Sequence, residues 1–300
     1  MIPPQEKSWT ASSAKRRNGD KTMDARCDLH THSLYSDGTN TPAELLTLAE
    51  EAGLSALVLC DHNTVAGLPH FLEAAQNSSV EAVPGIEFST DYQGIELHIL
   101  GLFIQEQHYD AVNALLEEAL ARKEQSNLEM ITRMQKQGFP FDYWAIKAES
   151  SGANMNRAVI SAYMVRHGFC STMNEAFDQW LNQGCGFYVP PERPDAIETI
   201  RFIKSIGAVA VLAHPLLSIE EVLLRQFLED AKELDGIEVY YSKYNETQTA
   251  LAAELAEEFG LVKSGGSDFH GNNKPDIHIG VGRGNLSIPL SCLDELKKRR

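Results

Sequence analysis

Two histidines separated by a single residue are the first candidate metal ligands along the sequence. His30 and His32 follow a short apolar start to what we expect to be a strand. Residues two positions apart in a strand point to the same face, so both imidazoles could bind one metal ion. Such pairs also arise by chance, and the meaning of this one depends on what else meets it in the fold.

Polar residues recur in the same position relative to later apolar runs. Asp268 and His270 repeat the spacing of two, with Phe269 facing the opposite side. Taken singly, His98 could be a hydrogen-bonded core histidine, and His214 could simply end a strand. Six of the ten histidines nevertheless fall at such places, and strand ends converge in open α/β sheets and in parallel barrels. The candidates at these places are His30, His32, Asp61, His62, Glu87, His98, His214, Asp268 and His270.

The chemistry of these candidates is imidazole and carboxylate without thiolate. This donor set suits Zn²⁺, Mn²⁺ or Fe²⁺ better than a structural zinc site built from cysteines. Nine candidates exceed what one ion can bind, so we expect two or three divalent ions bridged by a carboxylate, with Mg²⁺ as an alternative. Such centres hydrolyse phosphate esters by clamping the ester oxygens and activating water.

The elements that must position these residues alternate between strand and helix patterns. A helix is expected over 42–52, with Thr41 as its N-cap and Gly53 as its stop. This alternation predicts an α/β fold with a largely parallel sheet, either open or closed into a barrel. The other runs are strands near 55–60, 82–88, 95–103, 208–213, 236–241 and 261–264, and helices near 195–206, 219–234 and 245–259.

The middle of the chain lacks strand patterns. A long polar-faced helix is expected over 109–137, with further helices near 157–167 and 174–181. We therefore expect a helical insertion, or cap, over 108–192. It would divide a metal-binding catalytic core formed by 25–107 and 193–288, which follows a flexible tail over 1–24.

Composition limits the classes of partner. Lys and Arg number 26 against 42 Asp and Glu, a net charge of −16, which argues against long nucleic acids and membrane surfaces. A phosphate substrate remains compatible, since bound metals supply local positive charge. Five scattered cysteines without a CxxC pair favour a reducing cytoplasm. No apolar run approaches the roughly 18 residues of a membrane span.

Several stretches, taken in order, resemble the PHP (polymerase and histidinol phosphatase) family of metal-dependent phosphoesterases. They are DLHTHSLYSDGTNTP, LVLCDHNTVAG, VPGIEFST, ELHILGLF, VLAHPLL and GGSDFHG. The resemblance covers about 26–107 and 193–284. The segment NEAFDQWLNQGCGFYVP is similar to the insertion of a bacterial subgroup that includes nucleoside 3′,5′-bisphosphate phosphatases.

This resemblance implies a distorted (β/α)7 barrel that holds up to three metal ions. Glu87 would bridge the first two ions, and Asp37 enters as a ligand of the third. The first ion would be held by His30, His32, Glu87 and Asp268, the second by Glu87, His98 and His214, and the third by Asp37, His62 and His270.

Asp61 and Arg157 are candidates for catalysis. Asp61 could orient the neighbouring His62, or it could cap the next turn. In the subgroup, the insertion often carries an Arg-Pro-His run that faces the substrate, and Arg157 is followed here by Ala158 and Val159. Arg157 could grip a phosphate through its fork of donors or lie on an exposed helix face.

The function expected from these features is hydrolysis of a phosphate monoester of a small metabolite. The expected substrate is a nucleotide such as a nucleoside 3′,5′-bisphosphate. Alternatives are a 5′-3′ exonuclease that acts on short oligonucleotides, a histidinol-phosphate phosphatase, and a non-catalytic PHP module that binds metal.

Overall fold

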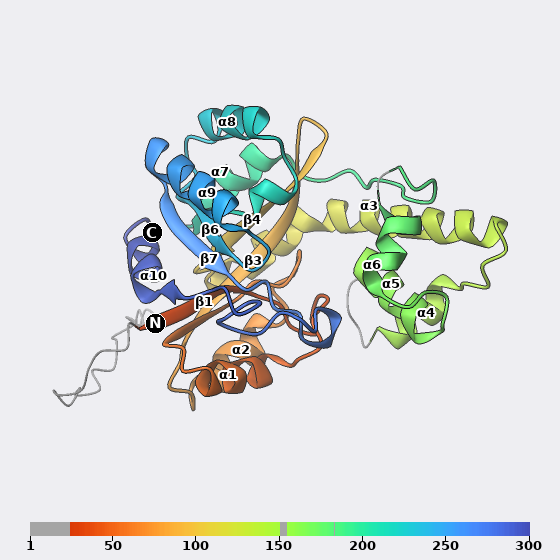
Figure 1. The fold of residues 1–300 in the computed structure, drawn as a ribbon, viewed down its shortest axis with the longest axis horizontal. Helices are drawn as coiled ribbons and strands as arrows, with labels where there is room; N and C mark the ends of the chain where they lie inside the picture. The colour runs from red at the N-terminus through yellow and green to blue at the C-terminus, as the bar shows by residue number, and fades with distance from the viewer. Residues whose placement is uncertain (1–24, 151–154, 183) are drawn as a thin grey trace, which may run out of the picture.

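The computed structural model describes residues 25–150, 155–182 and 184–300 of the chain. Figure 1 shows a barrel of strands surrounded by helices, from which one long helix leads to a group of shorter helices. The tail expected over 1–24 lies outside the described residues.

Eight strands form one sheet, and its two ends nearly close into a barrel. The order is β7-β6-β5-β4-β3-β2-β1-β8. Beyond the end of β7, the backbone N–H of His32 donates to Phe269 O at 3.0 Å, and that of Asp268 donates to His30 O at 2.9 Å, which joins β7 to β1. The α/β barrel expected from the sequence is confirmed. The strands are β1 (Arg26–Thr31), β2 (Ala56–Leu59), β3 (Glu81–Tyr92), β4 (Ile95–Leu102), β5 (Val209–Ala213), β6 (Gly236–Tyr241), β7 (Val262–Gly266) and β8 (Ile288–Pro289).

The sheet is more mixed than the sequence pattern predicts. β3 continues to Tyr92, and only Gln93 and Gly94 separate it from β4. Both turn residues have positive φ, 54° and 85°, as in the two-residue turns of β-hairpins. Strands joined this closely must be antiparallel, so β4 runs against both β3 and β5. The short β8 also pairs antiparallel with β1, so the described residues form eight strands where the resemblance implied seven.

Helices cover the outside of the barrel. Thr41 begins α1 with a capping box, because its hydroxyl accepts from Glu44 N while its own N–H donates to the Glu44 carboxylate. α8 is shorter than the expected 219–234, since it ends at Asp230. The barrel helices are α1 (Pro42–Glu51), α2 (Leu68–Ala75), α7 (Ala196–Ser205), α8 (Glu221–Asp230), α9 (Glu246–Glu258) and α10 (Leu290–Lys297), and the 3₁₀ turns are η1 (Glu106–His108), η3 (Pro215–Leu217) and η4 (Gly271–Asn273).

The segment between β4 and α7 forms a helical arm with an apolar cluster of its own. Its first helix joins the two parts, because Val112 and Leu116 pack into the barrel core and Met130 and Met134 pack into the arm. The arm consists of α3 (Tyr109–Lys136), α4 (Tyr143–Glu149), α5 (Arg157–Arg166), α6 (Met173–Ala176) and the π-helical turn η2 (Phe177–Leu181).

Two features bear on the environment of the chain. No helix within residues 25–150, 155–182 and 184–300 is long and apolar enough to cross a bilayer. All five cysteines are free, as their odd number and wide spacing predict.

Candidate metal centre

Nine imidazole and carboxylate side chains meet at one end of the barrel. His30 lies on β1, Glu87 on β3 and His98 on β4, and the others lie in loops that follow β1, β2, β5 and β7. Their ligand atoms form four groups in which all atoms lie within 4.8 Å of one another. The groups are His32, Asp37, His62 and His270; His30, His32 and Asp268; His30, Glu87 and His214; and His62, Glu87 and His98.

Glu87 is the centre of this cluster and is fully buried. Its Oε1 lies 2.7 Å from Nδ1 of His98 and 3.0 Å from Nε2 of His214. Its Oε2 lies 3.1 to 3.2 Å from three further imidazole nitrogens, those of His30, His32 and His62. One carboxylate surrounded by five imidazoles has the position that a ligand bridging several ions would need.

His98 reaches this cluster because β4 is antiparallel. The register places His98 opposite Ala213, the last residue of β5, so its ring lies beside that of His214. In a parallel strand, the residue that reaches the cluster would lie at the carboxyl end of the strand. In the antiparallel β4, His98 lies in the first half of the strand, which explains why this histidine stands inside an apolar run.

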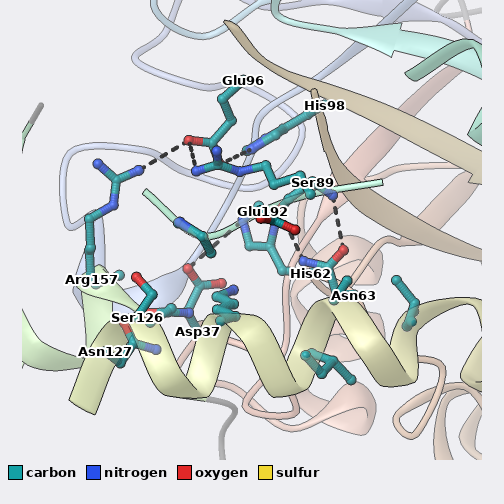
Figure 2. A pocket seen from close by; sticks show the side chains of 18 of the residues that line it. Asp37, His62, Asn63, Ser89, Glu96, His98, Ser126, Asn127, Arg157 and Glu192 are labelled. Atoms are coloured by element: carbon teal, nitrogen blue, oxygen red, sulfur yellow. Dashed lines mark hydrogen bonds and ion pairs between the residues drawn. The ribbon is translucent and has the colours of Figure 1, made fainter. Parts of the chain in front are cut away.

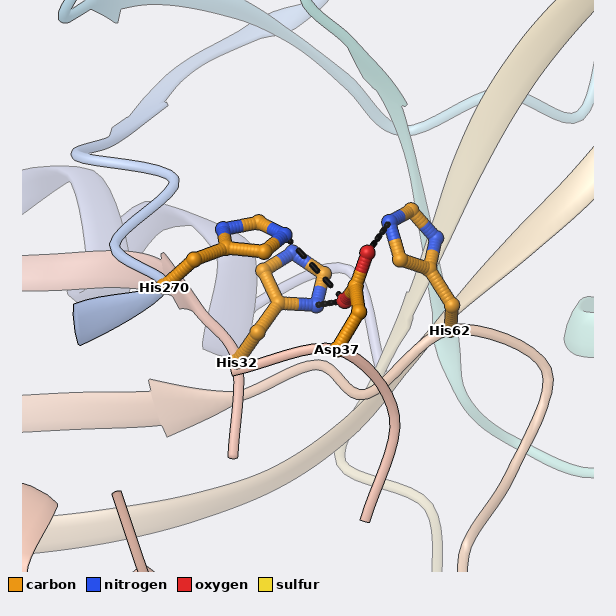
Figure 3. Close-up of side chains that lie close together, drawn as sticks. All are labelled: His32, Asp37, His62 and His270. Carbon is orange, nitrogen blue, oxygen red and sulfur yellow. Dashed lines mark ion pairs between the residues drawn. The ribbon is translucent and has the colours of Figure 1, made fainter. Parts of the chain in front are cut away.

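Asp37 forms a second focus of the cluster (Figure 3). Its carboxylate lies between the imidazoles, with Oδ1 3.2 Å from Nε2 of His270 and 3.9 Å from Nδ1 of His32. Its Oδ2 lies 3.9 Å from Nε2 of His62. The geometry therefore places His32 with Asp37 as well as with His30, and His62 with Glu87 as well as with Asp37. This sharing differs from the simple three-ion division that the resemblance implies.

Asp268 joins the two foci and is fixed by residues that the sequence did not reveal. Its Oδ1 lies 3.3 Å from His32 Nε2 and 3.3 Å from His270 Nδ1. Its Oδ2 accepts from the Tyr241 hydroxyl at 2.7 Å and from Lys274 Nζ at 2.6 Å. Neither donor stands in a recognisable pattern in the sequence, because both depend on how β6 and the loop after β7 fold back.

Several buried polar atoms in the cluster lack hydrogen-bond partners among the described residues. Nε2 of His30 and Nε2 of His32 are 3.0 Å apart, where one ring can donate to the other. His32 Nδ1, His62 Nδ1 and Glu87 Oε2 have no hydrogen-bond partner among the described residues. A buried polar atom without a partner costs about 1 to 3 kcal/mol, and cations would satisfy these atoms together. The residues present therefore fit a site for divalent metal ions.

The electrostatics of the cluster also favour cations. Burial alone would raise the pKa of Glu87, but the imidazoles of His62 and His30 hold it well below its usual range. The pKa of Asp37 is likewise low, because His270 and His62 outweigh its burial. For His98, burial opposes the charged form, yet the Glu87 carboxylate raises its pKa to about 9. Glu87 and Asp37 are thus ionised at neutral pH, and metal binding would release a proton from His98.

A glycine allows His30 to reach this position. A Cβ added to Gly266 at the end of β7 would lie 2.2 Å from Cβ of His30 and 2.7 Å from its backbone nitrogen. Only the absence of a side chain lets β1 and β7 approach so closely.

Asp61 has a different role from either of those expected. Its Oδ1 accepts from Ser33 N at 2.7 Å and from Ser36 Oγ at 2.7 Å, and its Oδ2 accepts from Ser33 Oγ at 2.6 Å. Among the described residues, the hydrogen bonds of its carboxylate all go to this loop, so the carboxylate neither orients His62 nor caps the following turn. Donors of the loop occupy both carboxylate oxygens of Asp61. Asp61 thereby holds in place the loop that carries Asp37.

A pocket opens beside the cluster, between the barrel and the arm (Figure 2). Asp37, His62 and His98 line it on the side of the cluster. The arm and the segment that returns from it supply basic and aromatic side chains, namely Lys123, Arg157, Phe177, Tyr188 and Arg193. The pocket thus joins the candidate metal ligands to a cationic wall.

Arg157 lies in this wall and not on an exposed helix face. Its side chain is 27 % exposed, and its guanidinium carbon lies 4.4 Å from the centre of the Tyr188 ring. Its Nη2 is 3.3 Å from Oε2 of Glu96, and Arg193 donates to the same oxygen at 2.7 Å. Glu96 also approaches His98, at 3.4 Å, so one carboxylate links both arginines to the cluster. No pattern in the sequence pointed to Arg193 or Glu96, which lie 97 positions apart.

Lys123 is the third cation of the wall. It is half-buried on α3 and lines the pocket. It makes no hydrogen bond or ion pair with any residue that the structure describes. Burial lowers the pKa of Lys123. The nearby charges of Arg193 and Arg157 also lower it, whereas the carboxylates of Asp37 and Glu96 raise it. In the sequence it is one of many charged residues on a long polar helix, which is why the pattern did not distinguish it.

Comparison with known proteins agrees with this geometry. A family model described as PHP domain matches residues 28–171. The 5′-3′ exoribonuclease of Haemophilus influenzae is 35% identical over 251 residues, which cover 83% of this chain and 91% of the relative. The 3′,5′-nucleoside bisphosphate phosphatase of Chromobacterium violaceum is 27% identical over 267 residues, which cover 85% and 91%.

A solved structure agrees over nearly the whole chain. It is a protein of Bifidobacterium adolescentis, provisionally designated a metal-dependent phosphoesterase, with a TM-score of 0.80 and 25% identity. The match covers 92% of this chain and 96% of that one. With its barrel, its imidazole and carboxylate cluster and these relatives, the chain belongs to the PHP domain family and is a metal-dependent phosphoesterase.

Proposed function

We propose that this protein hydrolyses a phosphate ester of a small nucleotide, with a nucleoside 3′,5′-bisphosphate as the leading substrate. The observation that supports this proposal most strongly is the pocket in which candidate metal ligands face a wall of three cations. A substrate with two phosphates could place one at the cluster and the other at the wall.

The proposed centre uses His30, His32, Asp37, His62, Glu87, His98, His214, Asp268 and His270 to hold two or three ions of Mn²⁺, Zn²⁺ or Fe²⁺. When bound, such ions polarise the phosphoryl oxygens and lower the pKa of a water. The chain's own part is to fix the ions around Glu87 and to present the edge formed by Asp37, His62 and His98 to the pocket.

The cationic wall would bind and orient the remote phosphate. Arg157 offers a planar fork of donors that suits a phosphate, and its stacking on Tyr188 holds the fork in place. Lys123 has no anionic partner among the described residues, so its charge is available to a ligand. Because Lys123 and Arg157 of the wall lie on the arm, we propose that 108–192 acts as a substrate-binding cap on the core formed by 25–107 and 193–288.

A second candidate is a 5′-3′ exonuclease on short oligonucleotides. It is favoured by the similarity to the Haemophilus influenzae exoribonuclease, which extends over 91% of that protein. The net charge of −16 disfavours long nucleic acids, which require many basic contacts to phosphates. A cytoplasmic location fits both candidates and the five free cysteines.

Product analysis distinguishes these candidates. The purified protein, reconstituted separately with Mn²⁺, Zn²⁺, Fe²⁺ and Mg²⁺, would be incubated with nucleoside 3′,5′-bisphosphates, nucleoside monophosphates, histidinol phosphate and 5′-phosphorylated di- and trinucleotides. Release of inorganic phosphate from the bisphosphate, faster than from any other compound, is the expected result. Faster release of mononucleotides from the oligonucleotides would favour the exonuclease. Preference for histidinol phosphate would reject both nucleotide proposals.

A further inference from the structure

Glu238 is a buried carboxylate that contacts two members of the cluster, His30 and His214. It lies on β6, has no exposed surface, and belongs to none of the four ligand groups. Its Oε1 lies 3.1 Å from Nδ1 of His30, and its Oε2 accepts from the backbone N–H of His214 at 2.8 Å. His30 and His214 are two of the three members of one ligand group, whose third member is Glu87.

We propose that Glu238 is a positioning residue, which selects the ring form of His30 and holds the backbone of His214 so that both can bind the same metal ion. The proposal rests on the metal centre of the proposed function. It adds a residue outside the nine ligands and a specific task for it.

The ring form of His30 follows from the chemistry of a carboxylate. An ionised carboxylate only accepts hydrogen bonds, so the imidazole must carry its proton on Nδ1 to meet Glu238. Nε2 is then free to bind a metal through its lone pair. Nε2 is the atom that faces the cluster, at 3.1 Å from Oε2 of Glu87. Carboxylates that fix metal-binding histidines in this manner raise metal affinity.

The backbone of His214 needs support for a different reason. Its φ of 30° lies in the left-handed region, which is unfavourable for a residue with a side chain. The hydrogen bond to Glu238 holds the chain at this bend, where β5 ends and η3 begins. In this conformation, Nε2 of His214 lies 3.0 Å from Oε1 of Glu87.

Glutamine cannot perform both tasks. The backbone N–H of His214 can only donate, so the amide oxygen of a glutamine would have to face it. The NH₂ group would then face Nδ1 of His30 and donate to it, which moves the imidazole proton to Nε2, the metal-facing atom. Turning the amide round would set two donors against each other at His214. The substitution Glu238→Gln therefore keeps the size of the side chain and removes its function.

Metal binding by the full chain provides the test, with Asp235→Asn as a matched control. Asp235 immediately precedes β6, is also buried, and accepts from Ala210 N and Lys204 Nζ without contacting the cluster. Parent, Glu238→Gln and Asp235→Asn would be stripped of metal and titrated with Mn²⁺. Ions per chain and dissociation constants would be measured, together with thermal unfolding of the metal-free forms.

We expect Glu238→Gln to bind about one ion per chain fewer, or to bind its weakest ion about 10- to 100-fold less tightly. Asp235→Asn should unfold at a lower temperature but bind metal like the parent. In a His30→Ala background, Glu238→Gln should lower the affinity by a smaller factor, because one of its two targets is already gone.

Equal metal content and affinity in the parent and in Glu238→Gln would overturn the positioning role. If the glutamine variant does not fold, Glu238→Asp replaces it, since this variant keeps the charge and withdraws both oxygens; affinity equal to that of the parent would again contradict the proposal. A parent that binds no Mn²⁺, Zn²⁺ or Fe²⁺ would instead reject the metal centre itself. The two failures are thus distinguishable.

Discussion

At the scale of single residues, the site depends on one carboxylate shared among five imidazoles. Eight of the nine candidate ligands could be named from the sequence because each stands beside or within an apolar run, whereas Asp37 was named only through the resemblance to the PHP family. The structure brings all nine together. Lys123, Arg193 and Glu238 could not be named. They lie on a polar helix, in a loop and in an apolar strand, and only the fold gives them partners or a pocket.

The role of His98 can be tested by metal analysis. His98→Ala removes the imidazole nearest to Glu87 Oε1, so the variant should hold less metal than the parent after equal loading. His167→Ala serves as the control, because His167 is exposed and pairs with Glu149 on the arm. The same metal content in the His98 variant would mean that His98 is only a core residue.

For Arg157, steady-state kinetics provide the test. Arg157→Ala should raise KM for a bisphosphate about tenfold, equivalent to about 1.4 kcal/mol, because a partly exposed arginine already paired with Glu96 contributes modestly. The value of kcat should change less. Arg166→Ala, at the exposed end of the same helix, is the control. Unaltered KM and kcat in the Arg157 variant would rule out the phosphate contact.

The role of Lys123 in binding the second phosphate can be tested by comparing a bisphosphate with a monophosphate. Lys123→Gln should raise KM for a bisphosphate by about tenfold or more and change KM for a monophosphate much less, since only the former reaches the wall. In the parent, this advantage should fade as the pH rises through the pKa of Lys123, which burial places below its ordinary value. Lys136→Gln on the same helix is the control. Equal effects on both substrates would contradict a role in binding the remote phosphate.

At the scale of elements, most helices and strands follow from local patterns. The capped helix α1, the long α3 and strand β6 have nearly the bounds that the sequence predicts. The antiparallel direction of β4 was not predicted, because an apolar run does not show whether its strand is parallel or antiparallel to its neighbours. The feature that decides the direction is the short turn at Gln93 and Gly94. The role of Asp61 was missed because its partners, Ser33 and Ser36, are ordinary loop residues until the barrel closes.

The close approach of β7 to β1 can be tested by a substitution that adds one methyl group at Gly266. Gly266→Ala would place a Cβ about where His30 now lies, so either the strand pairing or the ligand must move. We expect the free energy of unfolding to fall by about 1 to 3 kcal/mol and metal binding to weaken. Ser264→Ala on the same strand is the control, because its buried hydroxyl has no partner among the described residues. Parent-like stability and metal content in the Gly266 variant would show that this contact does not position His30.

At the scale of the whole molecule, three cationic side chains of an acidic chain lie in the pocket where the substrate would bind. The chain carries a net charge of −16, yet its pocket gathers Lys123, Arg157 and Arg193 beside a site suited to cations. Composition alone predicts the class of partner but not this wall, because the wall is built from residues on the arm and on the segment that returns to the barrel. We propose that this wall selects the substrate, and sequence patterns do not describe it.

Metal removal should therefore affect stability as well as activity. Ions that bind only the folded chain stabilise it by about 2.7 kcal/mol at 100 times their dissociation constant. Chelation should lower the midpoint of thermal unfolding by about 5 °C or more, and readdition of Mn²⁺ should restore it. His98→Ala should show a smaller shift than the parent. An unchanged midpoint in the parent would indicate that the cluster holds no metal tightly.

The most direct test of the central claim is phosphate release by one preparation with and without its metal. The chain would be stripped of metal and assayed with adenosine 3′,5′-bisphosphate, then reconstituted with Mn²⁺, Zn²⁺ or Fe²⁺ and assayed again. We predict no turnover by the stripped protein and steady release of inorganic phosphate after reconstitution with at least one of these ions. Turnover that is equal with and without metal, or the absence of turnover of any phosphate ester with every metal, would contradict the account.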